Sequence, residues 1–385
     1  MLIVDDAVVI RRLVSDVLGG VRTIEVVGTA RNGRLALAKL PQLDPDLVIL
    51  DVEMPEMDGI ETLTALRELR PRLPVIMFST LTEQGTAITL EALMRGANDY
   101  VPKPANVGSV SEAMDRVRSE LVPRIHSLCG LDTTPPAADA TIPRTRSQPV
   151  GSTGPRPVVP DRPAGAAPDQ RVDAVVIGIS TGGPSALAEI VPLLPADLAV
   201  PLLVVQHMPP MFTRLLAERL DRSTALAVAE AGGGESLGAG QCWIAPGDRH
   251  LKVGPARLAP PEDGSRASRR ASHIEIEDGP SENSCRPSVD VLFRSAAHVY
   301  GPHLLGVVMT GMGQDGLKGS EAIVAAGGRV ISQDEPTSVV WGMPGAVTRA
   351  GLSDAVLPLR EVPAEIVRRV AAHRCESSPR MGTVR

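Results

Sequence analysis

Short apolar runs alternate with stretches of helical periodicity along the first part of the chain. The runs predict strands at residues 2–4, 25–27, 46–50, 73–78 and 99–101. Strands that are apolar throughout, with helices between them, are typical of a parallel sheet whose two faces are both covered. We therefore expect a doubly wound α/β domain of flavodoxin-like type at residues 1–122.

The same alternation resumes in the second part of the chain. Apolar runs predict strands at residues 174–177, 202–205, 304–309 and 328–331, with a strand break at Gly178. Residues 242–277 look more antiparallel, and the polar residues 260–272 within them predict a surface loop. We expect a second α/β domain over residues 171–370, with a Rossmann-like, doubly wound parallel sheet.

A proline-rich segment separates the two halves. Nine prolines lie between residues 131 and 170, among alanine, threonine, serine and glycine. Such a composition cannot bury enough apolar surface to offset the entropy lost on ordering the chain. The sequence therefore predicts a flexible linker at residues 123–170, and a polar C-terminal tail at residues 371–385.

Composition and charge exclude several classes of protein. The 385 residues are 43% hydrophobic and 22% charged, which is typical of globular proteins. No segment is strongly basic, the net charge is −6 and aromatic residues make up 2% of the chain, so nucleic-acid binding is disfavoured. The N-terminus does not resemble a signal peptide, and no apolar run reaches the roughly 18 residues that a membrane span needs.

The four cysteines lie far apart and form no CxxC pair. This spacing favours free thiols in a reducing compartment over a disulfide framework or a zinc site. We expect a cytoplasmic protein without membrane insertion.

Three aspartates follow predicted strands of the first domain. Asp5 and Asp6 end the first strand and Asp51 ends the third. In a parallel sheet the carboxyl ends of the strands meet at one edge, where ligands bind. Converging carboxylates repel one another unless a hard divalent cation lies among them, so Asp5, Asp6 and Asp51 predict a Mg²⁺ site.

Two further residues at this edge suggest phosphoryl chemistry. Ser79 ends the fourth strand and Lys103 follows the fifth. A lysine and a metal ion offset the charge of phosphoryl oxygens, and a hydroxyl can sense the product. Each aspartate taken alone could cap a helix or start a turn, but the whole set favours a phospho-acceptor site.

A glycine-rich turn, GISTGGP at residues 178–184, opens the second half after a strand. It could bind a dinucleotide, but Ser180 occupies the place of the second glycine, where the backbone approaches the phosphate. The strand expected to supply a ribose-binding acid ends in Gln206 and His207 instead. We favour a turn that presents Ser180 as a nucleophile.

A nucleophilic serine needs a base and an acid that orients the base. Of the seven histidines, His207 directly follows a buried strand on the edge of Ser180, and His250 is a competitor. Asp315 follows another strand within a glycine-rich segment whose amides could stabilise an oxyanion. We predict a triad of Ser180, His207 and Asp315, in a chain order that disfavours the lipase-type α/β-hydrolase topology.

Residues 1–120 resemble a response-regulator receiver domain. The matching motifs are VDD at 4–6, LDVEMP at 50–55, DG at 58–59, Ser79 and YVPKP at 100–104. The resemblance implies that Asp51 is the phospho-acceptor and that Ser79, Tyr100 and Lys103 switch the domain. It also implies Mg²⁺ as the cofactor of phosphorylation and a chemotaxis histidine kinase as the phosphodonor.

Residues 171–360 resemble the catalytic domain of the chemotaxis protein-glutamate methylesterases, the CheB family. The matching motifs are GISTGGP at 178–184, VQHMP at 205–209, IAPGDRHL at 244–251, RPSVDVLF at 286–293, MTGMGQDG at 309–316 and WGMP at 341–344. The resemblance implies Ser180 as nucleophile, His207 as base and Asp315 as its orienting acid. It adds the backbone N–H of Met312 as an oxyanion donor.

Together the two resemblances imply a phosphorylation-activated hydrolase. Its substrates would be glutamate methyl esters, and also glutamine side chains, on methyl-accepting chemoreceptors, and the esterase reaction would need no cofactor. The unphosphorylated receiver would cover the catalytic cleft. The alternative is a receiver-containing, non-catalytic adaptor that binds chemoreceptors.

Overall fold

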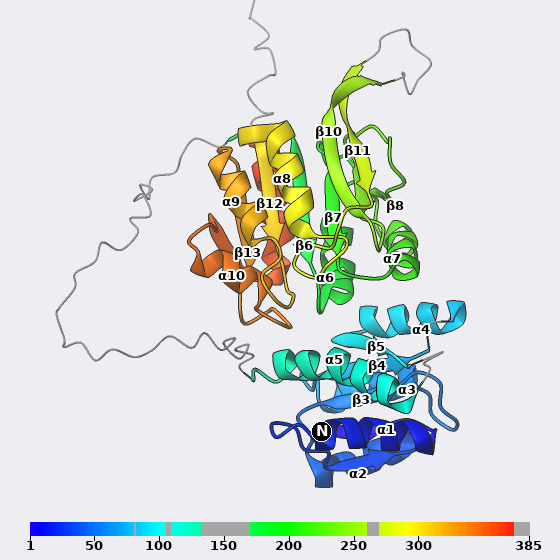
Figure 1. Ribbon diagram of the computed structural model, residues 1–385. Coiled ribbons are helices and arrows are strands. Elements are labelled where there is room, and N and C mark those ends of the chain that lie inside the picture. The colour runs from blue at the N-terminus through cyan, green and yellow to red at the C-terminus, as the bar shows by residue number, and fades with distance from the viewer. Residues whose placement is uncertain (81, 105–108, 132–169, 260–268, 373–385) are drawn as a thin grey trace, which may run out of the picture.

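The computed structural model describes residues 1–80, 82–104, 109–131, 170–259 and 269–372. Most of the predicted linker and nearly all of the predicted tail lie outside these residues. Two parallel sheets, each between layers of helices, form the two halves of the molecule (Figure 1). The predicted fold class, two α/β domains with parallel sheets, is confirmed.

The first sheet has the strand order β2-β1-β3-β4-β5, which is the flavodoxin-like order. Its strands are β1 (Leu2–Val4), β2 (Gly28–Ala30), β3 (Val48–Asp51), β4 (Val75–Ser79) and β5 (Asp99–Pro102). Its helices are α1 (Val8–Gly19), α2 (Gly33–Leu43), α3 (Gly59–Leu69), α4 (Glu83–Met94) and α5 (Val110–Leu128). Successive residues of a strand face opposite ways, so Ile49 packs with α1 and α5 while Leu50 packs with α2, α3 and α4.

The second sheet has the strand order β14-β13-β12-β6-β7-β9-β8, and all of its pairings are parallel. Its strands are β6 (Ala174–Ile179), β7 (Leu202–Gln206), β8 (Ala227–Glu230), β9 (Gln241–Ile244), β12 (Leu304–Val308), β13 (Arg329–Gln333) and β14 (Ala355–Leu357). A separate antiparallel hairpin consists of β10 (His250–Ala259) and β11 (Arg269–Glu277).

Helices cover both faces of this second sheet. They are α6 (Gly183–Ile190), α7 (Pro210–Ser223), α8 (Val289–Tyr300), α9 (Leu317–Ala325), α10 (Met343–Arg349) and α11 (Val362–Ala371). Short 3₁₀ helices lie at Val191–Leu193, Gly301–His303 and Leu359–Glu361. In the described part of the chain, no helix combines the length and apolar character that crossing a membrane would require.

The structure corrects several local expectations. The second strand lies at Gly28–Ala30 rather than at 25–27, because pairing with β1 sets its register. The strand β6 continues through Gly178, where a Cβ would lie 2.3 Å from Val289 Cγ1; the glycine allows α8 to approach the sheet instead of breaking the strand.

The region expected to be more antiparallel is only partly so. The strand β9 pairs in parallel with both β7 and β8, and only β10 and β11 pair antiparallel. The expected surface loop is shorter than predicted, because β11 already begins at Arg269, while residues 260–268 lie outside the described part. The helix α5 ends at Leu128.

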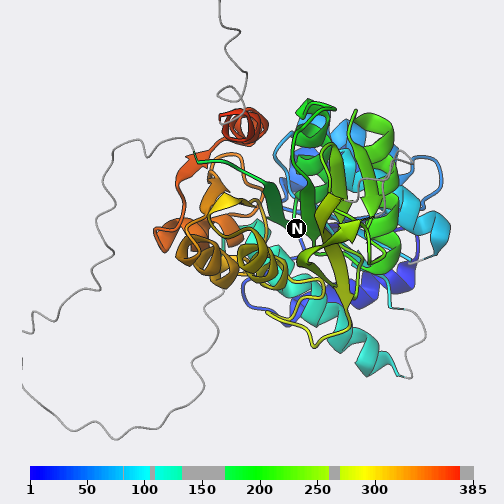
Figure 2. The ribbon, with the colours of Figure 1, turned by 90° about the horizontal axis from the view of Figure 1, so that it is seen from above.

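The two halves are packed against each other. The helix α4 packs against α6 and α7 and lies below them in Figure 1. Figure 2 views the molecule from the side of the second domain. This contact brings β5 of the first sheet to the end of the second sheet where β6 and β7 stop.

Candidate functional site

The strand order of the second sheet reverses beside its first strand. From β6, the chain continues to β7 on one side and later returns to β12 on the other. Such switch points are where α/β sheets bind ligands, outside the carboxyl ends of the strands. Ser180 follows β6, His207 follows β7, and Asp315 lies in the loop after β12, so the predicted triad residues surround the switch point.

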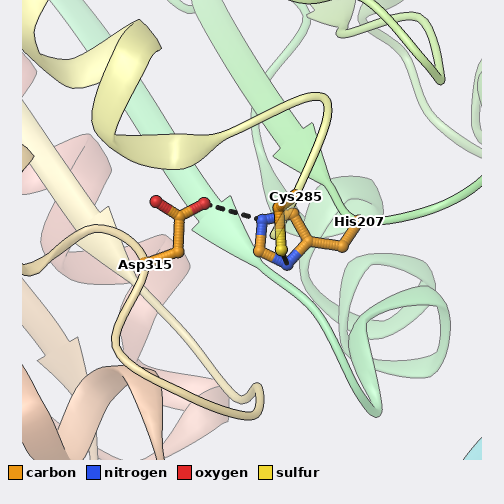
Figure 3. Close-up of side chains that lie close together, drawn as sticks. All are labelled: His207, Cys285 and Asp315. Carbon is orange, nitrogen blue, oxygen red and sulfur yellow. Dashed lines mark hydrogen bonds and ion pairs between the residues drawn. The ribbon is translucent and has the colours of Figure 1, made fainter. Parts of the chain in front are cut away.

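His207 and Asp315 are in direct contact. His207 Nε2 lies 2.8 Å from Asp315 Oδ2, and the side chain of His207 is 13% exposed while that of Asp315 is 2% exposed. On the opposite side of the imidazole ring, Nδ1 lies 3.6 Å from Cys285 Sγ (Figure 3). The base candidate is therefore held between a carboxylate and a thiol.

The N-terminal end of helix α8 surrounds the Asp315 carboxylate with donors. The Ser288 hydroxyl donates to Oδ1 at 2.9 Å, the amide of Val289 to Oδ2 at 2.7 Å and the amide of Asp290 to Oδ1 at 3.1 Å. The side-chain amide of Asn283 adds a bond of 2.8 Å. The first turn of a helix leaves backbone N–H groups without helical partners, so it binds an anion well.

These contacts shift the pKa values of Asp315 and His207 in opposite directions. Burial opposes ionisation of Asp315, but the bond from His207 and the amides of α8 outweigh it and lower the pKa of Asp315 to about 2. Burial also opposes a charged His207, yet the contacts with Asp315 and Cys285 raise the pKa of His207 to about 9. Asp315 is thus a fixed anion that favours a proton on the imidazole.

The turn after β6 places Ser180 beside the loop that carries Asp315. The amide of Ser180 donates to Thr310 O at 2.9 Å, and a Cβ on Gly311 would lie 2.7 Å from Ser180 Cβ. Gly182 adopts a φ of 79°, which a glycine reaches without strain. Among the described residues the Ser180 hydroxyl makes no hydrogen bond, so its contact with His207 stays a prediction.

The predicted oxyanion donor lies in the same loop. Met312 follows Gly311, and its amide donates no hydrogen bond to any residue that the structure describes. The neighbouring carbonyl of Gly311 is occupied, since it accepts from the amides of Gly342 and Met343. The Met312 N–H therefore remains available near Ser180.

The competing histidine has a different place. His250 is 2% exposed; its Nε2 lies 3.0 Å from Pro280 O, and its Nδ1 accepts from the amide of Ser288 at 3.2 Å. Both ring nitrogens are used to hold the segment before α8. His250 therefore supports the Asp315 surroundings and has no nitrogen left to serve as a base.

The carboxylate cluster of the first domain forms at the predicted edge. Lys103 Nζ lies 2.8 Å from Asp5 Oδ2 and 2.7 Å from Asp51 Oδ2. Burial raises the pKa of Asp51 to about 6, against the lowering effect of Lys103. Asp51 also accepts the amide of Val52 at 2.8 Å, so only a few donors hold this carboxylate.

The cluster fits a hard divalent cation. Carboxylate oxygens of Asp5, Asp6 and Asp51 lie within 4.8 Å of one another. Asp5 Oδ2 is buried and, although close to the lysine, accepts no well-directed hydrogen bond. Buried Asp5 and Asp51 beside exposed Asp6 leave one open side for water ligands, which Mg²⁺ retains in proteins.

The remaining two receiver residues lie near this cluster and at the domain contact. Ser79 is buried at the end of β4, and its hydroxyl lies 3.2 Å from Thr80 O. Tyr100 on β5 stacks on Phe212 of α7, with ring centroids 4.5 Å apart and an angle of 27° between the planes. Tyr100 is thus placed against the second domain.

Further contacts join β5 to the turn that carries Ser180. The Thr181 hydroxyl donates to Asp99 Oδ2 at 2.8 Å, and the amide of Gly182 donates to Asn98 O at 3.0 Å. Arg219 of α7 pairs with Glu91 of α4 beside them. Residues directly after the candidate nucleophile therefore bind the first domain.

Sequence reasoning assigned no role to several residues of the site. Cys285, Asn283 and Ser288 contact His207 or Asp315, and Thr181 bridges the domains. Ser288 lies within the RPSVDVLF motif at 286–293, which marked the segment without showing which side chains point to Asp315. A single sequence does not show which segments, far apart in the chain, lie side by side in the fold.

Comparisons with known proteins cover both halves. A family model described as CheB methylesterase matches residues 175–366, and one described as response regulator receiver domain matches residues 1–115. A protein-glutamate methylesterase/protein-glutamine glutaminase of Nocardioides sp. is 51% identical over 375 residues, which are 97% of this chain and 96% of that protein.

Two further matches are similar in kind. A protein of the same name from Trichodesmium erythraeum is 45% identical over 372 residues, covering 96% of this chain and 98% of its own length. The crystal structure of the Thermotoga maritima CheB methylesterase catalytic domain is 40% identical with a TM-score of 0.46, and the match covers 51% of this chain and 98% of that one.

Proposed function

The chain belongs to the CheB methylesterase family, and from this premise we propose that it is a phosphorylation-activated serine hydrolase acting on chemoreceptors. It removes methyl groups from glutamate methyl esters and deamidates glutamine side chains, as the names of its relatives state for those proteins. The observation that carries the proposal is the anchored Asp315 carboxylate, which holds His207 next to the Ser180 turn.

In the proposed reaction Ser180 attacks the ester carbonyl and His207 takes the hydroxyl proton. Because Asp315 occupies Nε2, the nitrogen that accepts this proton is Nδ1. The amide of Met312 donates to the oxyanion. Methanol leaves from an ester, or ammonia from an amide, after the imidazolium returns the proton; water then releases the carboxylate and regenerates the Ser180 hydroxyl.

The nucleophile is tested with Ser180→Ala, assayed by methanol release from methylated receptor. We expect release to be lost, and labelling by a fluorophosphonate to disappear with it. Ser185→Ala, a serine one turn further along the chain, is the matched control and retains both. Persistent methanol release from Ser180→Ala would end the proposal, and a non-catalytic adaptor would leave wild-type Ser180 unlabelled.

The first domain is proposed to be the phosphorylated switch. Asp51 accepts the phosphoryl group, and Asp5, Asp6 and Asp51 would hold Mg²⁺, which when bound would neutralise charge on the phosphoryl oxygens. Lys103 pairs with Asp5 and Asp51 and lies directly after β5, whose residues contact the catalytic domain. The kinase of a chemotaxis pathway is the proposed phosphodonor, in the cytoplasm.

The contact between the domains supports a mechanism of control. Asn98 and Asp99 accept hydrogen bonds from the residues that follow Ser180. Tyr100 stacks on a residue of α7, the helix that follows His207. In the unphosphorylated state the receiver would restrict access of a receptor helix to Ser180. Phosphorylation would favour an undocked state through Lys103 and β5, which is a shift between two populations.

Asp51→Asn tests this control. We expect the variant to keep the basal rate of methanol release and to lose stimulation by a small-molecule phosphodonor. A normal response of Asp51→Asn would show that another residue accepts the phosphoryl group. The division into a receiver at 1–122, a linker at 123–170, a catalytic domain at 171–370 and a tail at 371–385 also stays a prediction, which limited proteolysis of the full chain tests.

A further inference from the structure

The thiol of Cys285, which has no part in the proposed esterase reaction, lies beside the catalytic imidazole and forms a pair of potential metal ligands with it. Cys285 Sγ faces His207 Nδ1 at 3.6 Å, and His207 Nε2 is bonded to Asp315 on the other side of the ring (Figure 3). The side chain of His207 is 13% exposed, and Cys285 is also partly exposed. The three residues come from three separate segments of the chain that meet only in the fold.

The spacing of the sulfur and the nitrogen matches a zinc chelate. A tetrahedral zinc ion with a Zn–S bond of about 2.3 Å and a Zn–N bond of about 2.0 Å holds these two atoms about 3.5 Å apart. We propose that Cys285 Sγ and His207 Nδ1 form an inhibitory site for a thiophilic divalent cation such as Zn²⁺. Water would complete the coordination, and the thiol proton, together with the proton on Nδ1 of a protonated His207, would pass to solvent on binding.

Asp315 completes this arrangement without touching the metal. A histidine that binds a metal through one nitrogen commonly donates its other N–H to a carboxylate, which fixes the ring and makes it a stronger ligand. Asp315 already holds Nε2 in this way, and the amides of α8 hold Asp315. The ring therefore need not turn for Nδ1 to bind a cation.

The two domains would then select different cations. The receiver cluster offers carboxylate oxygens, which suit Mg²⁺, whereas Cys285 and His207 offer sulfur and nitrogen, which suit Zn²⁺. This inference rests on the proposed function in one respect: occupation of Nδ1 removes the atom that accepts the Ser180 proton. Zn²⁺ would thus stop demethylation even when Asp51 is phosphorylated.

Binding is measured first, on the full chain with Mg²⁺ in excess. Co²⁺ serves as the spectroscopic probe, because a thiolate ligand gives an absorption band that carboxylate ligands do not give. We expect the band in the wild type, its displacement by Zn²⁺, and its loss in Cys285→Ser. The control replaces Cys129, which among the described residues is the other partly exposed cysteine, together with Cys375, and keeps the band. A wild type without the band, or a Cys285→Ser variant that retains it, would refute the site.

A second binding measurement tests whether His207 binds the cation together with Cys285. Asp315→Asn keeps both ligands but loses the carboxylate behind the ring. We expect Zn²⁺ to bind this variant about 10–100-fold more weakly, as is typical when such a partner is removed. Equal affinity in the wild type and in Asp315→Asn, measured by calorimetry, would contradict the proposed role of His207 as the second ligand.

Inhibition is measured last, as the ratio of the rates of methanol release with and without Zn²⁺ for each protein. We expect reversible inhibition of the wild type and of the Cys129→Ser/Cys375→Ser control, and at least roughly tenfold lower sensitivity in Cys285→Ser. A cobalt band in a protein that releases no methanol would leave the metal site standing and refute the proposed function. Equal Zn²⁺ sensitivity in the wild type and Cys285→Ser would refute the inhibitory role of the site.

Discussion

Two buried aspartates, Asp51 and Asp315, lie at the carboxyl edges of the parallel sheets in the two domains, and their environments shift their pKa values in opposite directions. Asp51 has a pKa raised to about 6 by burial, which Lys103 offsets only in part. Asp315 is equally buried, yet its pKa is lowered to about 2. The same residue type at the carboxyl edge of a parallel sheet thus has two different chemical characters.

The difference comes from the hydrogen-bond donors around each carboxylate. Asp51 accepts one amide and faces one lysine. Asp315 accepts hydrogen bonds from His207, from Asn283 and from the N-terminal end of α8. A carboxylate with few donors remains open to a metal ion and to a phosphoryl group, whereas one with many donors is fixed as an anion that orients a base.

The largest effect is expected from removing the charge of Asp315. Asp315→Asn should reduce kcat for methanol release by about 10⁴-fold, because an amide does not stabilise the imidazolium of His207 and can favour the wrong tautomer. Asp51→Asn, the same replacement at the other aspartate, should leave the unstimulated rate intact. Equal losses of activity in the two variants would remove the distinction between the two carboxylates.

The second prediction concerns the pH dependence of stability in Mg²⁺-free solution. Since Asp51 binds its proton more tightly when folded, its contribution to stability falls as pH rises from about 4 to about 6. Near pH 4, Asp51→Asn should unfold at the same urea concentration as the wild type; at pH 7 it should be more stable by about 3 kcal/mol. Adding Mg²⁺ should stabilise only the wild type.

The contribution of Asp315 to stability should change with pH in the opposite direction. Its pKa is lowered on folding, so its contribution is present above pH 4 and is lost as pH falls towards about 2. Urea unfolding of the wild type and of Asp315→Asn below pH 4 measures this. A stability difference between the two proteins that stays constant from pH 4 down to pH 2 would contradict the assignment.

A smaller effect is expected from removing one donor. Ser288 is fully buried, and its hydroxyl donates to Asp315 Oδ1. Ser288→Ala should cost about 1–3 kcal/mol of unfolding free energy, because the buried carboxylate loses a partner. The exposed Ser281 provides the control, since Ser281→Ala removes the same atom without a contact to Asp315. A Ser288→Ala variant as stable as the control would show that the other donors suffice.

The smallest effect is expected where the two domains meet. The pair of Glu91 and Arg219 is partly exposed, so it contributes about 0.2–1 kcal/mol to docking. Glu91→Ala should therefore raise the unstimulated rate of methanol release by a factor of about 1.5 to 5, while Glu68→Ala, an exposed glutamate on α3, leaves it unchanged. A lower rate in Glu91→Ala would mean that docking promotes activity.

Much of this organisation could be predicted from sequence because it is local. Apolar runs that end in polar residues place Asp51 at the end of β3 and His207 after β7, and the topology of parallel sheets brings such ends to one edge. The order of strands at the sheet edges was harder to predict. The strand β2 is short and exposed on one side, so its register depends on β1 rather than on its own pattern.

The sequence by itself therefore determined the two parallel-sheet domains, the family and the residues that gather at each sheet edge, because period and motif are properties of neighbouring residues. Only the tertiary structure decided that α8 anchors Asp315, that Nδ1 of His207 faces Cys285 and that β5 covers the turn after Ser180. These features depend on the approach of segments far apart in the chain. Hydrogen-bond direction and burial exist only once those segments have packed.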